Sequence, residues 1–291
     1  GLEMTHEGVP ALQEAAGRKR RVRKRRRERR LEKLEQAAAG MPEAARHVVI
    51  DGVRRLLAYQ DWKYARLYLE RLQPVAEADR HAASEGKLLS TVAHCLAARM
   101  SFDDIIRIAQ FRSNPARQQR IAAELGIVQE PPHVASIRLD IGELCQVLPP
   151  DAARRLLSLL KQYPWLRRPH WTIQTQRSSI RSTLCFRLLA KLRRLRPQTY
   201  RYAQEQSAIK YWLEHVLDAA RFSPALACEI SECAQLIKGY GDAHKRGAAN
   251  FLMISEKIIR PVLHQQLPIQ QAIETLVRAR KVAWRSDGQA L

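Results

Sequence analysis

The amino-acid sequence predicts an all-α fold: an irregular multi-helix domain of about nine to eleven helices, without a sustained β-sheet. Apolar residues recur at the helical spacing in nearly every segment after Pro42. Capping residues, glycines and prolines separate these segments at short intervals. No segment alternates apolar and polar residues over the length of a strand. The chain has 291 residues, 46% of them hydrophobic, which is enough for a substantial helical core.

Residues 1–40 precede this pattern and are predicted to form a basic, poorly ordered or frayed helical lead. Within it, Arg18–Arg30 contains eleven basic residues and a single Glu. Leu31 and Leu34 follow, but they are not part of a wide apolar face. Charge runs of this kind usually remain solvated. We therefore place the helical domain at residues 41–291.

The first helices are predicted from apolar residues at the i, i+4, i+7 and i+8 positions. One stripe occupies residues 49–57, and a second occupies residues 64–72 after a break near Asp61. The tyrosines and polar residues of 59–68 are expected at the edge of the core, with their hydroxyls satisfied by neighbouring groups. A longer apolar segment spans residues 88–96.

Ser101–Asp104 has the sequence of a capping box, which predicts that a helix begins near residue 105. The same motif explains the adjacent carboxylates Asp103 and Asp104 without assigning them to catalysis. A further helix begins at Asn114-Pro115 and ends at Gly126. Pro131-Pro132 excludes helix within residues 127–138, so we expect extended structure there and a candidate joint between two parts of the domain.

The remaining helices are delimited in the same way. Helices are predicted at residues 140–148 and 151–163, followed by a loop at 164–177. Further helices are predicted at 178–195, ending before Pro197, and at 198–220, 224–238, 243–263 and 268–283. Ser223-Pro224 supplies an N-cap and a proline at the first helical position. Residues 239–242 are a turn.

The net charge of +21 indicates an anionic partner or ligand. Arg18–Arg30 contributes a net +10, so the rest of the chain still carries +11. The basic run would bind nucleic-acid phosphates non-specifically. It has no interleaved aromatic residues on which bases could stack, and it matches no nucleic-acid-binding motif.

The five cysteines are widely spaced, without a C-x-x-C pair, which argues against a disulfide framework and a zinc site. We expect small buried residues in a reducing compartment. No apolar stretch approaches the roughly 20 residues that span a bilayer, and no secretory signal is recognisable. The prediction is a cytoplasmic protein without a membrane partner.

Recognisable catalytic motifs are absent from the sequence. It contains no G-x-G-x-x-G, no phosphate-binding P-loop, no G-x-S-x-G and no H-E-x-x-H. No cysteine spacing suits an iron–sulfur cluster. We therefore assign no catalytic residue and no metal ligand, and we expect no autonomous catalytic site and no cofactor bound by this chain alone.

The segment Lys238–Gly247 is the best candidate for a functional contact. Two glycines permit positive φ, and basic residues gather near the start of the next helix, where anions are favoured. The candidate contacts with an anion or a partner are Lys238, Tyr240, Asp242, His244, Lys245 and Arg246. The alternative interpretation is a solvated basic turn in which Asp242 caps the next helix.

Six segments carry a resemblance to a known family, and they occur in the same order over residues 43–262. They are GVRRLLAYQD (52–61), YARLYLERL (64–72), AARMSFDDIIRIA (97–109), ELCQVLP (143–149), RYAQEQ (201–206) and LIKGYGDAHKRGAANF (236–251). The chain resembles the helical domain that follows the oxidoreductase gamma-type domain in indolepyruvate oxidoreductase beta-type subunits. Similar domains occur in fused indolepyruvate ferredoxin oxidoreductases.

This resemblance implies a subunit of a 2-oxoacid oxidoreductase complex that converts an arylpyruvate to an aryl-acetyl-CoA. Thiamine diphosphate and CoA would serve the parent complex. The resemblance supplies no catalytic residue for these positions. We therefore expect a non-catalytic scaffold or interface domain whose basic surface meets other oxidoreductase subunits or a CoA phosphate. The alternative is a nucleic-acid-associated helical protein that uses Arg18–Arg30 as a basic arm.

Overall fold

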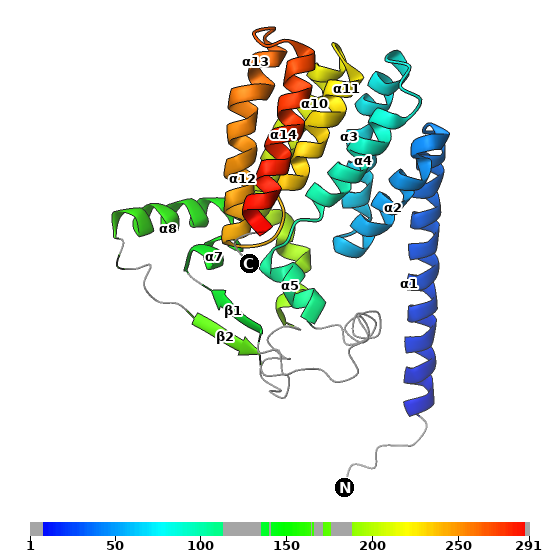
Figure 1. Cartoon of the computed structure of the whole chain (residues 1–291). Coiled ribbons are helices and arrows are strands. Elements are labelled where there is room, and N and C mark those ends of the chain that lie inside the picture. The colour runs from blue at the N-terminus through cyan, green and yellow to red at the C-terminus, as the bar shows by residue number, and fades with distance from the viewer. Residues whose placement is uncertain are drawn as a thin grey trace, which may run out of the picture.

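The computed structural model describes residues 8–112, 135–139, 141–163, 165, 171–175 and 188–288. Helices dominate this part of the chain, so the predicted all-α class is confirmed (Figure 1). The helices are α1 (Gly8–Ala39), α2 (Glu43–Tyr59), α3 (Trp62–His81), α4 (Lys87–Met100), α5 (Ile105–Arg112), α7 (Ile141–Cys145), α8 (Pro150–Gln162), α10 (Tyr200–Ala220), α11 (Pro224–Cys233), α12 (Asp242–Ile254), α13 (Arg260–Leu263) and α14 (Ile269–Gly288).

Shorter helical elements connect some of these. Two are 3₁₀ helices, η2 (Leu192–Gln198) and η3 (Ala234–Leu236). A π-helical segment, Ser255–Ile259, joins α12 to α13 without a break. The helix predicted at 178–195 was expected to end before Pro197, but the helical structure continues through Pro197 as η2.

Side-chain caps begin several helices where the sequence places them. The Asp61 carboxylate accepts a hydrogen bond from the backbone of Tyr64 at 3.0 Å and starts α3. The Ser223 hydroxyl accepts from the backbone of Leu226 at 3.2 Å, with Pro224 in the first turn of α11. Each cap satisfies a donor that the helix itself cannot pair.

The predicted capping box at residues 101–104 is wrong in its residues. The cap of α5 is Asp104, whose carboxylate accepts from the backbone of Arg107 at 2.6 Å. Ser101 instead ends α4: its hydroxyl donates to the carbonyl of Ala97 at 2.8 Å and accepts from Arg55 Nε at 2.6 Å. The local sequence allows either Ser101 or Asp104 to cap α5, and only the contacts with neighbouring helices decide between the two.

The described strands form a two-stranded antiparallel ladder. Strand β1 (Ala135–Leu139) pairs with β2 (Trp171–Thr175), with Ala135 opposite Thr175 and Leu139 opposite Trp171. Strand β1 overlaps the extended structure expected at 127–138. Strand β2 corrects the loop expected at 164–177, because its pairing partner lies more than thirty residues away and leaves no local signal. The helix predicted from Asn114 to Gly126 lies outside the described residues.

Helix α4 forms the centre of the core. It contacts α2, α3, α10, α11 and η3, and its buried side chains point to nearly every side of the helix. A helix that is apolar around its circumference is stable only when other helices cover it. The core extends from Leu34 and Ala38 in α1 to Ala283 in α14.

Three buried tyrosines tie α2 and α3 to α4 and the turn after it, as the sequence predicts for the stripe at 59–68. The hydroxyl of Tyr59 donates to the carbonyl of Phe102 at 3.0 Å, that of Tyr64 to Met100 at 2.9 Å, and that of Tyr68 to Ala93 at 3.0 Å. Burial raises the pKa of Tyr68, which therefore stays a neutral donor. These residues are structural.

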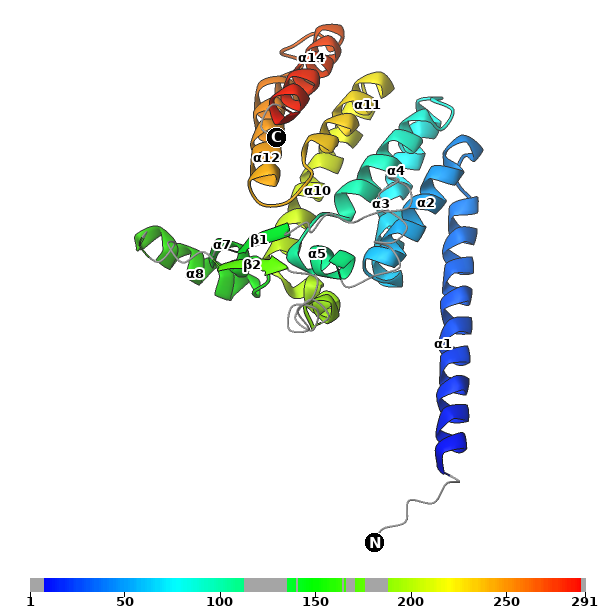
Figure 2. The same cartoon turned by 60° about the horizontal axis from the view of Figure 1, so that its bottom comes forward.

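Helix α1 runs along α2, and its N-terminal part projects beyond the body of the molecule (Figures 1 and 2). Its last turns are packed, because Leu34 and Ala38 are buried in the core. The packed domain therefore begins before residue 41. None of the helices in the described part of the chain has the length and apolar character needed to span a membrane.

Candidate functional site

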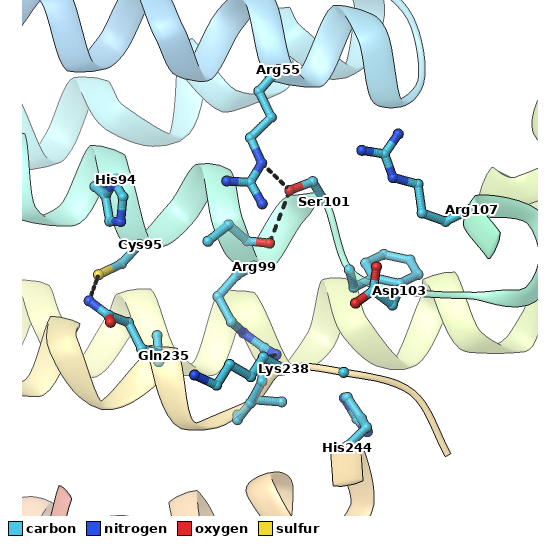
Figure 3. A pocket seen from close by; sticks show the side chains of 15 residues that line it. Arg55, His94, Cys95, Arg99, Ser101, Asp103, Arg107, Gln235, Lys238 and His244 are labelled. Atoms are coloured by element: carbon cyan, nitrogen blue, oxygen red, sulfur yellow. Dashed lines mark hydrogen bonds between the residues drawn. The ribbon is translucent and has the colours of Figure 1, made fainter. Parts of the chain in front are cut away.

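The loop between η3 and α12 has the backbone conformation that its glycines predict. Gly239 has φ of 81° and Gly241 has φ of 61°. These are left-handed values that residues with a Cβ adopt at a cost. Helix α12 then begins at Asp242. The glycines turn the chain sharply, which places Lys238 and His244 beside the end of α4 (Figure 3).

The structure divides the six predicted contact residues. Lys238 and His244 lie at the site, with Lys238 Nζ 4.4 Å from the ring centre of Trp284. Asp242 and Lys245 are exposed and pair with each other at 3.2 Å. Arg246 is exposed and Tyr240 is half-buried, and neither lines the cavity described below. Asp242 does not cap α12 through its side chain.

His244 belongs to a buried cluster of charged residues. The carboxylate of Glu205 on α10 lies 3.1 Å from Arg99, 3.0 Å from Arg201 and 2.9 Å from His244 Nε2. The side chains of Arg99 and Glu205 are only 3% and 4% exposed. Arg99 also donates to the carbonyl of Ile237 at 3.5 Å. One arginine from the central helix thus connects α10 with the loop that leads into α12.

Electrostatics keeps this cluster ionised. Burial alone would raise the pKa of Glu205, but the contact with His244 and the charges of Arg99 and Arg201 outweigh it and lower the pKa to about 2. Burial lowers the pKa of Arg99, and Glu205 partly offsets this effect. Two arginines share one carboxylate, so the cluster keeps a net positive charge.

A cavity of about 280 Å³ adjoins this cluster and shares Arg99 and His244 with it. Arg55 from α2, Arg99 from α4, Arg107 from α5 and Lys238 from the loop before α12 all line it. Figure 3 shows Arg55 reaching toward Ser101, while Lys238 and His244 lie on the opposite side of the view. The other lining residues are His94, Cys95, Ala98, Ser101, Phe102, Asp103, Ala234, Gln235, Ile237, Gly239 and His244.

The charges of this lining are strongly unbalanced. Asp103 is the one acidic residue among the lining side chains, against three arginines and one lysine. Burial lowers the pKa of Arg55, while the nearby Asp103 raises it. Low-dielectric walls that carry one sign of charge attract ions of the opposite sign. The cavity is therefore suited to bind an anion.

The side chains of the cavity offer no activated nucleophile. Burial raises the pKa of Cys95 to about 12, so its sulfur remains a thiol, which accepts a contact from Gln235 at 3.9 Å. Among the described residues, no group of three or more His, Cys, Asp or Glu side chains is arranged to hold a metal ion.

A second buried ion pair fixes one wall of the site. Arg196 on η2 is fully buried and makes a two-point pair with Asp104, at 2.7 and 3.0 Å. Its third nitrogen donates to the carbonyl of Tyr59 at 3.1 Å and to Gln60 Oε1 at 2.9 Å. Because Asp104 also caps α5, Arg196 holds the first turn of α5 against α2. Arg107 in that turn lines the cavity.

Sequence reasoning found Lys238 and His244 but missed Arg55, Arg99 and Arg107. These arginines stand in helices where an isolated basic residue is usually solvated. A signal was nevertheless present. Four segments that carry the family resemblance, namely 52–61, 97–109, 201–206 and 236–251, supply the charged residues of the cavity and of the cluster that adjoins it.

Comparison with known proteins places the chain in a family but gives it no activity. The chain matches no curated protein and no solved structure. Residues 45–257 match a family of unknown function (DUF6537). This match includes every residue that lines the cavity. The match covers most of the chain, and the protein therefore belongs to this family of unknown function, DUF6537.

Proposed function

We propose that this chain is a non-catalytic scaffold and interface domain, and that its cationic cavity holds an anionic group carried by the assembly that it joins. One observation carries the proposal. Three stretches distant in sequence, residues 55, 94–107 and 234–244, line a single cavity that carries four basic side chains and one acidic one. Among these four, Arg99 is buried, whereas Arg55 and Lys238 are exposed, so a charged group of a partner can reach them.

The sequence resemblance suggests which assembly this is. Other subunits or domains of a 2-oxoacid oxidoreductase, of the indolepyruvate type, are the proposed partners. The anionic group would come from an acidic subunit face or from the phosphate of CoA. The one carboxylate in the lining makes the cavity a poor match for magnesium-bound thiamine diphosphate, whose metal prefers oxygen ligands. Thiamine diphosphate is therefore assigned to another part of the parent complex.

Affinity purification from the native host tests this proposal. The parent chain should recover oxidoreductase subunits, and a variant with Arg55→Gln and Lys238→Gln should recover markedly less of them. Arg54→Gln with Lys245→Gln is the matched control, because these neighbours do not line the cavity and pair with carboxylates elsewhere. Equal recovery by the parent and the cavity variant would contradict the proposal.

The non-catalytic part of the proposal has its own assay. The purified chain should not oxidise indolepyruvate when thiamine diphosphate, CoA and an electron acceptor are supplied. Adding the partner subunits that the affinity experiment recovers should restore turnover. Turnover by the chain alone would show that it has a catalytic site.

Helix α1 favours a second candidate function, non-specific nucleic-acid binding. Its basic run is helical and projects from the body (Figure 2). The side chains of Arg18, Arg21, Arg25, Arg26 and Arg29 are exposed. Such a surface would neutralise phosphates and release counterions. Electrophoretic mobility shifts with duplex DNA and RNA should show salt-sensitive binding that deletion of residues 1–30 abolishes; binding that survives this deletion would exclude α1 as the site.

A further inference from the structure

The basic groups at the cavity approach it from several directions. Arg55, Arg107 and Lys238 belong to three different elements, and Arg99 forms part of the base on a fourth. Beside them, Arg99 and Arg201 share the single carboxylate of Glu205. Arg55, Lys238 and the buried Arg99 thus stand against one carboxylate of the lining, Asp103. A monocarboxylate would leave a net positive charge at the cavity, whereas a group with two or more negative charges would balance it.

Two of the guanidinium groups at the cavity are held in place by contacts within the protein. Arg55 Nε donates a hydrogen bond to the Ser101 hydroxyl at 2.6 Å, which restricts the orientation of its guanidinium. Arg99 is held by Glu205 and by the carbonyl of Ile237. Guanidinium groups match the oxygen spacing of phosphate and bind it through two parallel hydrogen bonds. Ordering these side chains beforehand reduces the entropy lost on binding.

The size of the cavity limits the ligand further. Small-molecule sites usually measure about 300–1,000 Å³, and this cavity measures about 280 Å³. It has room for a charged head group, not for an entire nucleotide or coenzyme. Its polar lining and the single aromatic residue Phe102 do not provide a stacking surface of the kind that binds a base between rings.

We propose that the cavity binds a phosphoryl or diphosphoryl head group, in preference to the carboxylate of an acidic side chain. This inference rests on the proposed function and specifies its anionic group. The rest of the ligand would extend from the opening, near Lys238 and Trp284. Arg55 and Lys238 would contact the phosphoryl oxygens, and Arg99 would supply positive charge from the base of the cavity.

Calorimetric titration of the full chain tests this at constant ionic strength, with inorganic pyrophosphate, inorganic phosphate and succinate as probes. Pyrophosphate should bind with one-to-one stoichiometry, and more tightly than succinate. Arg55→Gln and Lys238→Gln should each weaken pyrophosphate binding by about tenfold, as expected for loss of a charge-assisted hydrogen bond. Arg54→Gln, on the same helix as Arg55, and Lys245→Gln, in the first turn of α12, should leave it unchanged.

Two further variants identify the location of binding. Asp103→Asn removes the one carboxylate of the lining and should tighten pyrophosphate binding by about threefold, because a repulsive charge is lost. A variant with Arg21→Gln, Arg25→Gln and Arg26→Gln should bind as the parent does. Loss of binding in that variant alone, with Arg55→Gln unaffected, would place the anion on α1 and overturn the inference.

The outcomes separate this inference from the proposed function. Succinate binding as tightly as pyrophosphate, with the same dependence on Arg55 and Lys238, would overturn the phosphoryl assignment and retain an anion-binding cavity. If no probe binds, the phosphoryl assignment is overturned as well. The interface role would still stand if the affinity purification recovers partners in a way that depends on Arg55 and Lys238. Circular dichroism of each variant confirms that it is folded.

Discussion

Replacement of Arg196 by alanine should destabilise the domain by about 3–5 kcal/mol, the usual cost of breaking a buried ion pair from one side. Arg196 is fully buried, and its loss leaves the Asp104 carboxylate, itself 7% exposed, without its countercharge. The carbonyl of Tyr59 and the amide oxygen of Gln60 lose a donor too. Each buried group left unpaired costs about 1–3 kcal/mol, which is consistent with the total.

Urea unfolding followed by circular dichroism measures this cost from the transition midpoint and slope. Arg54→Ala is the control, because its pair with Glu35 is exposed and should contribute only about 0–1 kcal/mol. Asp104→Asn should lower the free energy of unfolding less in the Arg196→Ala background than in the parent, since the double variant no longer buries an uncompensated charge. An Arg196→Ala cost below about 1 kcal/mol, or equal to that of Arg54→Ala, would refute the assigned role of the buried pair.

Three other predictions concern stability. Gly247→Ala should cost several kcal/mol in urea unfolding, because its Cβ would overlap the carbonyl oxygen of Leu236, whereas Gly40→Ala, with 3.7 Å of space, should be neutral; equal effects would contradict the close packing. Deletion of residues 1–30 should leave the melting temperature nearly unchanged, and deletion of residues 1–40 should lower it, because only the second removes buried Leu34 and Ala38. The pKa of Glu205 falls from 4.5 to about 2 on folding. Its contribution of about 3 kcal/mol to the free energy of unfolding is therefore present above pH 4.5 and is lost as the pH falls toward 2. Glu205→Gln should flatten the acid limb of the plot of stability against pH, and an unchanged acid limb would contradict this.

The fold was largely predictable because helical periodicity and capping are local properties. Ser223 starts its helix as expected, and Asp61 caps α3 at the break expected there, since a cap needs only the donors of its own first turn. Strand β2 was not predictable in this way, because a short strand depends on a partner elsewhere in the chain. The packing of Leu34 was missed for a related reason. Two or three apolar residues are enough to pack the end of a charged helix when α2 and α3 provide the opposing surface.

The candidate site was predictable in part. The glycines and basic residues of 238–247 identify the loop, and the structure confirms that Gly239 and Gly241 have positive φ. The sequence could not distinguish Lys238 and His244, which face the site, from Lys245, which pairs with Asp242 in solvent. That distinction depends on the direction in which α12 leaves the loop. Arg99 and Glu205, more than one hundred residues apart, meet only in the folded chain.

Hydrogen–deuterium exchange with and without inorganic pyrophosphate tests the central claim most directly, because it locates bound anion along the chain. Segments 94–107 and 236–245 together contain most of the cavity lining. The account predicts that exchange slows in both segments at saturating pyrophosphate, and that Arg55→Gln with Lys238→Gln removes the effect. Slowing confined to residues 8–39, or no slowing at the cavity while the parent chain binds pyrophosphate, would contradict the account.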